Sequence, residues 1–506
     1  MASSLKGGLL ATYGSQLYVV GVGIAVTPLY LHALGPEAYG LVGFFAMLLA
    51  WFQLLDVGLS PTVVRETARY RGKAINAGSL RATVRAIEIV FLAVALTSAA
   101  ATVLLADLIA YCWLKPVAMA PAELREALYL MAGSIGLRFA AILYRAVLTG
   151  FERLTWLGGF NAGIATLRAF LVLPAMALFG ATPWVFFIVQ LLISLVELAW
   201  LVHQASRSLP ALGRAVGFSL RPLRGVARFS AAVAFTGGLT VTLTQADRLI
   251  LSGLLTLQDY AHFNLAVMAA SAVLLAGSPL ALALMPRISA LTAARQREEL
   301  LRLYVLSTRV MSLATLPLAF VLAAHAHTVM WAWTGLELAA SSAAPVLALY
   351  ALGNATVAHL ALPYLLQFAS GRLRMHVIGH VLLVATLIPG QVLLTMRYGA
   401  VGAGGFWLAV NLLYGCAWIP FALRGVAPDT LAGWYRGIAQ SALACAAAVL
   451  LLWPLQASAV AGGRLAAAAY LLLVGGACSV AVVLTSRPLR EAVLQRLRRS
   501  HAAEAA

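Results

Sequence analysis

Charged side chains that interrupt long apolar runs are the residues of this 506-residue chain best placed to do chemistry. Arg138 and Arg168 each stand well inside such a run, and Asp247 and Arg248 stand side by side in another. A charge inside hydrocarbon is costly, so residues of this kind mark functional sites by default. Guanidinium groups present several donors in a fixed fork and stay protonated, which suits phosphate and carboxylate groups. Arg138 and Arg168 are therefore candidate ligands for a negatively charged molecule.

Other polar residues lie on the same helix faces as Arg138 and Arg168. Arg138 lies seven residues before Arg145, and Asn161 lies seven residues before Arg168. Residues seven apart share one face of a helix, so each run carries a polar face with an arginine at middle depth. The alternative is structural: each arginine pairs with a carboxylate or with the carbonyl groups at a helix C-terminus.

Three uncharged or acidic positions complete the set of candidates. Gln16 and Gln245 lie in the first and seventh apolar runs, where each is expected to line a cavity. Asp56, in "LLDVGLSP", either takes up a proton, since burial raises a carboxyl pKa, or caps a broken helix beside Gly58 and Pro61. The sequence favours capping or pairing for Asp56.

The adjacent charges Asp247 and Arg248 are expected to act as a gating element. Neighbouring residues on a helix point about 100° apart, so these two side chains form no ideal pair with each other. Each should find a partner on another helix. The first half of the chain has Thr27 and Pro28 at the matching positions, so the charges are an asymmetry of the second half.

The composition predicts a polytopic helical membrane protein. Hydrophobic residues make up 62% of the chain and charged residues 10%, against roughly 25% charged residues in ordinary soluble chains. Apolar runs of about 20 residues recur along the whole length, whereas the alternating strands of a transmembrane barrel do not appear. The net charge of +18 lies mostly in short loops between the runs, which argues against nucleic acid as a partner.

Fourteen membrane spans account for the apolar runs, in an all-α fold. Their predicted ranges are 9–31, 38–61, 84–106, 123–148, 155–179, 183–203, 229–255, 260–285, 304–328, 344–369, 376–396, 401–423, 435–455 and 465–483.

The distribution of basic residues supports this number of spans and gives their orientation. With the N-terminus in the cytoplasm, the outer loops hold only Lys115, Arg397 and Arg464, and nearly all other loop arginines and lysines fall inside. Both termini are therefore predicted to be cytoplasmic. Glu88 and Glu197 lie within about two turns of the cytoplasmic ends of their spans, and cytoplasmic arginines are expected to pair with them.

An internal repeat predicts two halves of six spans. The first span leads into "LHALGPEAYG" and the seventh into "LLTLQDYAHF", so each is followed by a turn, an acid, a tyrosine and a new helix. Parallel repeats around a cavity are typical of transporters. The predicted domains are an N-terminal six-helix bundle, a basic cytoplasmic linker, a C-terminal six-helix bundle, two additional helices and a basic cytoplasmic tail, at residues 1–204, 205–228, 229–424, 425–485 and 486–506.

Several longer segments together resemble the polysaccharide transporter (O-antigen or lipid-linked oligosaccharide flippase) family of the multidrug/oligosaccharidyl-lipid/polysaccharide exporter superfamily. They are "YLHALGPEAYGLVGFFAML", "LLDVGLSPTVVRETARY", "YRAVLTGFERLTWLGGFN", "ADRLILSGLLTLQDYAHFNLA" and "LPYLLQFASGRLRM". The resemblance covers most of the first twelve spans. It implies two six-helix bundles in a V-shape that work by alternating access.

The resemblance also implies a function. The substrate would be an oligosaccharide on undecaprenyl diphosphate, flipped from the inner to the outer leaflet of the bacterial cytoplasmic membrane for cell-surface polysaccharide biosynthesis. No cofactor or metal is expected, and proton or sodium coupling stays open. Besides the substrate, membrane lipids and polysaccharide polymerase or assembly proteins are the expected partners.

Three other functions remain open. A cation-coupled drug exporter of the same superfamily is opposed by the extra pair of spans and by the arginines inside spans. A membrane-embedded polysaccharide assembly enzyme is opposed by the scattered outer acids and the absence of a large outer loop. A lipid-only scramblase or a scaffold is not excluded.

Overall fold

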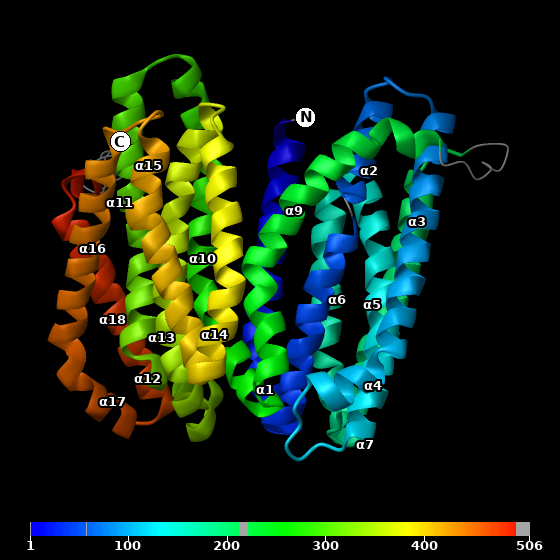
Figure 1. Ribbon diagram of the computed structural model, residues 1–506, viewed down its shortest axis with the longest axis horizontal. Helices are drawn as coiled ribbons and strands as arrows, with labels where there is room; N and C mark the ends of the chain where they lie inside the picture. The colour runs from blue at the N-terminus through cyan, green and yellow to red at the C-terminus, as the bar shows by residue number, and fades with distance from the viewer. Residues whose placement is uncertain (1, 57, 212–220, 492–506) are drawn as a thin grey trace, which may run out of the picture. The chain divides into compact units, whose positions relative to one another are not determined.

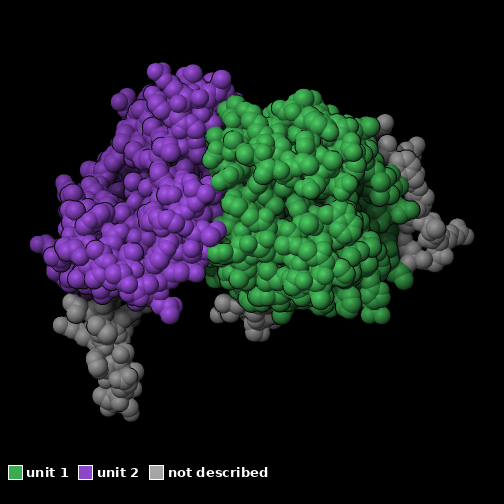
Figure 2. All heavy atoms as spheres, turned by 90° about the horizontal axis from the view of Figure 1, so that it is seen from below, with its two compact units in different colours: residues 1–261 green, residues 262–506 purple. Residues whose placement is uncertain are grey.

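The computed structural model describes residues 2–56, 58–211 and 221–491, and these residues form helices and no strands (Figure 1). The chain divides into two compact units, residues 1–261 and 262–506 (Figure 2). An all-α fold is what a membrane requires of these apolar runs, because a helix satisfies its own backbone hydrogen bonds.

The first unit is built from nine α-helices, a 3₁₀ helix and a π-helix within its described residues, and it also takes in the first turn of the helix that follows. In chain order they are α1 (Ala2–Phe52), η1 (Gln53–Asp56), α2 (Leu59–Arg71), α3 (Ala77–Leu104), α4 (Ala106–Leu108), η2 (Ile109–Trp113), α5 (Pro121–Gly150), α6 (Leu154–Phe170), α7 (Val172–Phe179), α8 (Pro183–Ser208) and α9 (Arg221–Leu254).

The second unit starts within α10 and continues to the end of the described residues. Its elements are α10 (Leu257–Ala293), α11 (Arg297–Ala324), α12 (Ala326–Thr334), α13 (Glu337–Ala369), α14 (Arg374–Leu413), η3 (Tyr414–Trp418), α15 (Ile419–Leu423), α16 (Thr430–Leu452), η4 (Trp453–Leu455), α17 (Gln456–Ala461) and α18 (Arg464–Thr485).

Two glycines explain how the helices correspond to the predicted spans. Eleven helical segments of the described residues are long and apolar enough to cross a membrane, and two of them have 43 and 50 residues. These two contain Gly35, with φ of 79°, and Gly399, with φ of 60°, where α1 and α14 each join two helices. Only glycine adopts a positive φ at little cost, so each glycine ends one span and starts the next. With α9 added, the helices match all fourteen predicted spans.

The boundary between the compact units differs from the predicted domain boundary. The sequence placed a linker at residues 205–228, of which 212–220 lie outside the described residues. In the structure α9 packs against α1, α2 and α3, so contacts assign it to the first unit. The predicted domains rest on the repeat and the charge pattern, and they stay a prediction.

Each unit has its own apolar core. In the first unit, buried residues of α2, α3, α5 and α8 pack together, with the rings of Phe91 and Phe139 stacked at 4.9 Å. In the second, the core joins α10, α11, α13, η3, α15 and α16. Cys445 and Cys478 are buried in the second unit, whereas Cys112 and Cys416 are exposed.

Candidate functional site

A buried carboxylate in the first unit gathers polar side chains from three helices. The two oxygens of Glu197 on α8 accept hydrogen bonds from Arg145 on α5 and from Arg168 on α6. The guanidinium of Arg145 also donates to the side-chain oxygen of Asn161 on α6. Arg168 donates to the hydroxyl of Ser194 at 3.2 Å. We call these five residues the Glu197 cluster.

The Glu197 cluster lies far from both ends of α8. Glu197 follows the helix start at Pro183 by fourteen residues and precedes the end at Ser208 by eleven. At 1.5 Å per residue these separations are roughly 21 and 16 Å. The hydrocarbon core of a bilayer is about 30 Å thick, so the carboxylate lies within it, nearer the Ser208 end, if α8 spans the membrane.

The cluster carries more positive than negative charge. Glu197 is one carboxylate between two guanidinium groups, and its side chain is 6% exposed, against 11% for Arg168 and 30% for Arg145. Within the described residues, Nε and Nη1 of Arg168 are buried and make no hydrogen bond. The cluster therefore keeps a formal charge of +1 and unused donors, a combination that favours an additional anion.

A break in α6 positions Arg168. Pro174 has no N–H to offer the carbonyl of Phe170, and α6 ends at Phe170. The hydroxyl of Tyr30 on α1 lies 2.8 Å from the carbonyl oxygens of both Arg168 and Ala169, and donates its single hydrogen to this pair. The last turn of α6 is thus fixed to α1 while the Arg168 side chain points to α8.

Arg138 lies apart from the Glu197 cluster. It precedes Arg145 by seven residues, or roughly 10 Å along α5. Its guanidinium carbon lies 5.6 Å from the centre of the Phe45 ring, a cation–π distance. In the part of the chain that the structure describes, no carboxylate lies within ion-pairing distance of Arg138. Among the described residues, Arg168 thus has the carboxylate partner that a structural role would require, and Arg138 does not.

The sequence overlooked Glu197 and Arg145 as members of a site. It predicted that cytoplasmic arginines pair with Glu197, and Arg145 is one of those arginines. The second partner, Arg168, lies inside a predicted span and was not expected to bind this carboxylate. The sequence also grouped Asn161 with Arg168, whereas Asn161 hydrogen-bonds Arg145. The seven-residue spacings were the available signal, because they put polar groups on faces that can meet.

Asp247 and Arg248 form no ion pair with each other, as their helical spacing predicts. Asp247 is 7% exposed, and its Oδ1 accepts the backbone N–H of Arg248 at 2.7 Å. Nε of Arg248 is buried and makes no hydrogen bond to a described residue. Their predicted gating role is not decided by these contacts and stays a prediction.

The remaining candidates have different surroundings. Gln16 on α1 is exposed, and Oε1 of Gln245 on α9 is buried without a hydrogen bond to a described residue. Asp56 accepts from the backbone N–H of Ser60 at 2.9 Å and from its hydroxyl at 2.8 Å, at the start of α2. These are the contacts that the capping alternative requires.

The structure gives partners to the acid of the repeat segment "LHALGPEAYG". The carboxylate of Glu37, just after the turn in α1, accepts from the backbone N–H groups of residues 117–119 at 2.5 to 3.3 Å. The same loop reaches the end of α9, because Lys115 donates from Nζ to the carbonyl of Leu254 at 3.1 Å and accepts from Leu257 at 3.0 Å. The loop after η2 therefore links α1 to the turn between α9 and α10.

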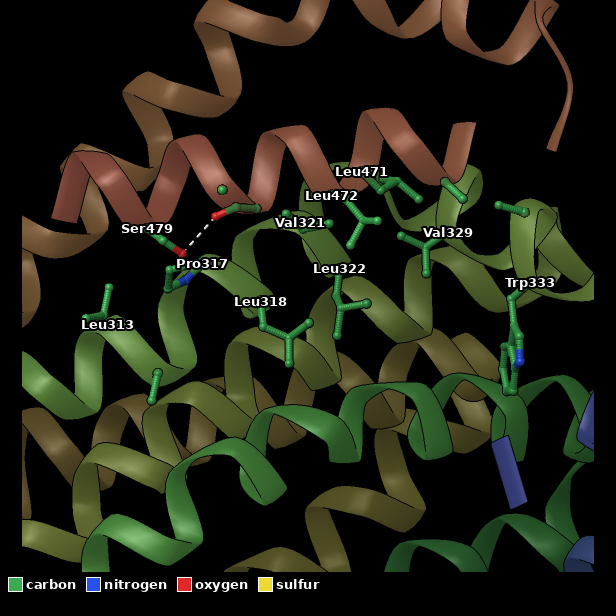
Figure 3. A pocket seen from close by; sticks show the side chains of 15 residues that line it. Leu313, Pro317, Leu318, Val321, Leu322, Val329, Trp333, Leu471, Leu472 and Ser479 are labelled. Atoms are coloured by element: carbon green, nitrogen blue, oxygen red, sulfur yellow. Dashed lines mark hydrogen bonds between the residues drawn. The ribbon is translucent and has the colours of Figure 1, made fainter. Parts of the chain in front are cut away.

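A pocket of about 640 Å³ in the second unit is almost entirely apolar (Figure 3). It lies between α11, α12 and α18, and the hydroxyl of Ser479 donates to the Gly475 carbonyl at 2.9 Å. This lining suits a hydrocarbon chain and offers nothing to hold a phosphate. No three histidine, cysteine or carboxylate side chains of the described residues are placed to hold a metal ion.

Comparison with known proteins identifies the fold. A lipid II flippase MurJ structure in an inward closed conformation superposes with a TM-score of 0.70 at 11% identity, over 96% of this chain and 99% of that one. An inward-facing multidrug resistance MATE family transporter of the MOP superfamily gives 0.63 at 15% identity, over 84% and 93%. The bent form of the Vibrio cholerae MATE transporter VcmN gives 0.53 at 16% identity, over 84% and 98%. At these identities the likeness concerns the fold alone.

Sequence comparison assigns the family. Curated protein sequences give no significant match. The polysaccharide biosynthesis protein family matches residues 5–292, which include the whole of α1 to α9 apart from the first three residues of α1. The superposed structures show the fold of the MOP superfamily. Because the family match covers more than half of this chain, the chain belongs to the polysaccharide biosynthesis protein family.

Proposed function

We propose that this protein flips an anionic lipid-linked oligosaccharide, of the undecaprenyl diphosphate type, from the inner to the outer leaflet by alternating access. The observation that carries the proposal is the excess positive charge of the Glu197 cluster, with Arg138 a further cation on α5. The family match and the fold of the superfamily support a membrane flippase or transporter.

The chemistry of the substrate explains why the site would need these groups. A pyrophosphate that enters hydrocarbon loses its hydration, and guanidinium donors can replace it. An empty site with two uncompensated cations would be costly, and Glu197 reduces that charge to +1. A phosphate would then accept from Nε and Nη1 of Arg168, which are unused, while Glu197 keeps its bond to Nη2.

The same proposal assigns a place and partners to the protein. We infer a multi-pass protein of the bacterial cytoplasmic membrane with both termini inside. It would serve the synthesis of a surface polysaccharide such as O-antigen, other lipopolysaccharide or exopolysaccharide, beside polymerase or assembly proteins and membrane lipids. Proton or sodium coupling would supply the free energy for net movement.

A drug exporter is the second candidate, because a multidrug MATE transporter shares the fold at a TM-score of 0.63. An exporter of organic cations needs a site with excess negative charge. The Glu197 cluster has the opposite excess, which favours an anionic substrate.

A deletion strain without a related flippase tests the proposal. Loss of the protein should leave the undecaprenyl-linked oligosaccharide on the inner leaflet, identified by mass spectrometry and assigned to a leaflet with an impermeant reagent. If the intermediate still reaches the outer leaflet at the normal rate, the proposal is wrong.

Point variants test the site within the same strain. Arg138→Ala and Arg168→Ala should abolish flipping at matched protein level, and lysine at either position should restore only part, because it lacks the planar fork. Arg153→Ala is the matched control, since Arg153 is an exposed arginine between α5 and α6. Wild-type flipping in both alanine variants would reject these arginines as ligands.

A further inference from the structure

Two histidine rings are in contact near the start of α14. His376 and His380 are four residues apart, so they share a face of the helix, and their ring centres lie 3.9 Å apart with the planes tilted by 48°. Neither residue belongs to the Glu197 cluster, which lies in the other unit. Two imidazoles this close interact strongly whenever either takes up a proton.

Aromatic residues from two neighbouring elements enclose the pair. The ring of Tyr364 on α13 lies 4.5 Å from that of His376. The ring of Tyr414 on η3 lies 5.8 Å from that of His380, and its hydroxyl is 3.4 Å from His380 Nδ1. η3 is a π-helix, a distortion that often accompanies functional sites.

The hydrogen bonds leave each imidazole able to accept a proton. His380 Nδ1 lies 3.0 Å from the carbonyl oxygen of His376. A carbonyl only accepts, so His380 carries its hydrogen on Nδ1, and its Nε2 keeps a free lone pair. The ring nitrogens of His376 make no hydrogen bond to any described residue. A neutral His376 therefore also keeps one nitrogen that can accept a proton.

The groups that face the pair are neutral tyrosines. α13 and η3 pack against α14 and contribute Tyr364 and Tyr414. The other titratable residues of these two elements point to other partners or lie further along their helices: Glu337, Tyr350, His359 and Cys416. His359, for example, is hydrogen-bonded to Ser312 on α11. On α14 itself, Arg374 lies two residues before His376, on another side of the helix.

We propose that His376 and His380 together bind a single proton and are the site through which transport is coupled to protons. The proton bonds to one imidazole nitrogen, the pair becomes singly positive, and no other bond is made or broken. A second positive charge at this separation is repelled by the first, and none of the described carboxylates lies within ion-pairing distance of either ring to offset it.

The coupling part of this inference rests on the proposed function, whereas proton binding does not. The added charge lies between α13 and η3, so protonation changes the contacts of both with α14. If the inward-facing and outward-facing conformations bind the proton with different affinity, proton binding shifts the balance between them. Proton movement is then linked to alternating access. The pair lies near the start of α14, which the charge distribution predicts to be the cytoplasmic end.

A titration of the purified protein tests the proton site without any substrate. Histidine labelled with ¹⁵N is introduced, and the imidazole signals of His376 and His380 are assigned from the variants His376→Gln and His380→Gln. The wild-type pair should titrate in two separate steps, the first of which adds one proton per molecule, and each variant should titrate in one. If both wild-type rings titrate together in a single step that matches the variants, the pair is not a shared site.

Transport in vesicles tests the coupling. An imposed pH gradient should speed the flipping of the lipid-linked saccharide severalfold in the wild type and not in either glutamine variant. His203→Gln, at an exposed position on α8, is the matched control and should respond as the wild type does. An unchanged response in both pair variants overturns the coupling. A protein that flips no saccharide in any vesicle rejects the proposed function instead, and the titration still decides the proton site.

Discussion

Glu197→Gln is the substitution that most directly tests the Glu197 cluster. Glutamine has nearly the same shape as glutamate, so packing on α8 is preserved while the shared negative charge is removed. Arg145 and Arg168 would then face each other across a neutral amide. Arg168 cannot escape to water, because its side chain is only 11% exposed.

The burial of the three groups sets the magnitude. Removing one partner of a buried ion pair costs about 3–5 kcal/mol. Arg145 is 30% exposed and can rehydrate, so most of the loss comes from Arg168, and we expect about 3 kcal/mol. At about 2–4 °C for each kcal/mol, the thermal midpoint should fall by about 6–12 °C. Arg145→Gln leaves the pair of Glu197 and Arg168 intact and should cost about 1 kcal/mol or less.

Thermal unfolding of the detergent-solubilised protein, followed by tryptophan fluorescence, measures these differences. The double variant Glu197→Gln, Arg168→Gln removes the stranded charge with its partner and should recover part of the loss. Two results would refute the reasoning. One is an equal loss in Arg145→Gln and Glu197→Gln, and the other is a double variant less stable than Glu197→Gln alone.

Three further predictions concern the remaining charges. Asp247→Asn and Arg248→Gln should each shift spin-label distances between the turn in α1 and the end of α9, and unchanged distributions in both would remove the pair from gating. Glu37→Gln should speed amide hydrogen exchange in the loop after η2 by about tenfold or more, since charge-assisted bonds become neutral ones; wild-type exchange rates would argue against the linkage. The Arg71 guanidinium lowers the pKa of Glu152, so the pair stabilises the fold above the usual carboxyl pKa and loses that contribution as pH falls through the lowered value. Glu152→Gln should flatten the dependence of the thermal midpoint on pH in that acidic range, and an unchanged slope would contradict the linkage.

The sequence by itself determined the class of fold and the order of the helices. Hydropathy and helix length are local properties, and hydrocarbon allows an apolar segment of this length little other than a helix. Even the two turns within α1 and α14, at Gly35 and Gly399, fall in the gaps between predicted spans. The contacts of Asp56 with Ser60 are equally local, since they join residues four apart at the start of one helix.

Only the tertiary structure decided which charged groups meet. Glu197 lies 52 residues from Arg145 and 29 from Arg168 along the chain, and all three come together because α5, α6 and α8 present particular faces to one another. The seven-residue spacings give the face of each helix but not its rotation toward its neighbours. An arginine side chain also reaches far enough to bind a carboxylate at a different depth. Residue spacing therefore predicted polar faces, whereas the choice between Arg138 and Arg168 as the partner of Glu197 depended on how the helices pack.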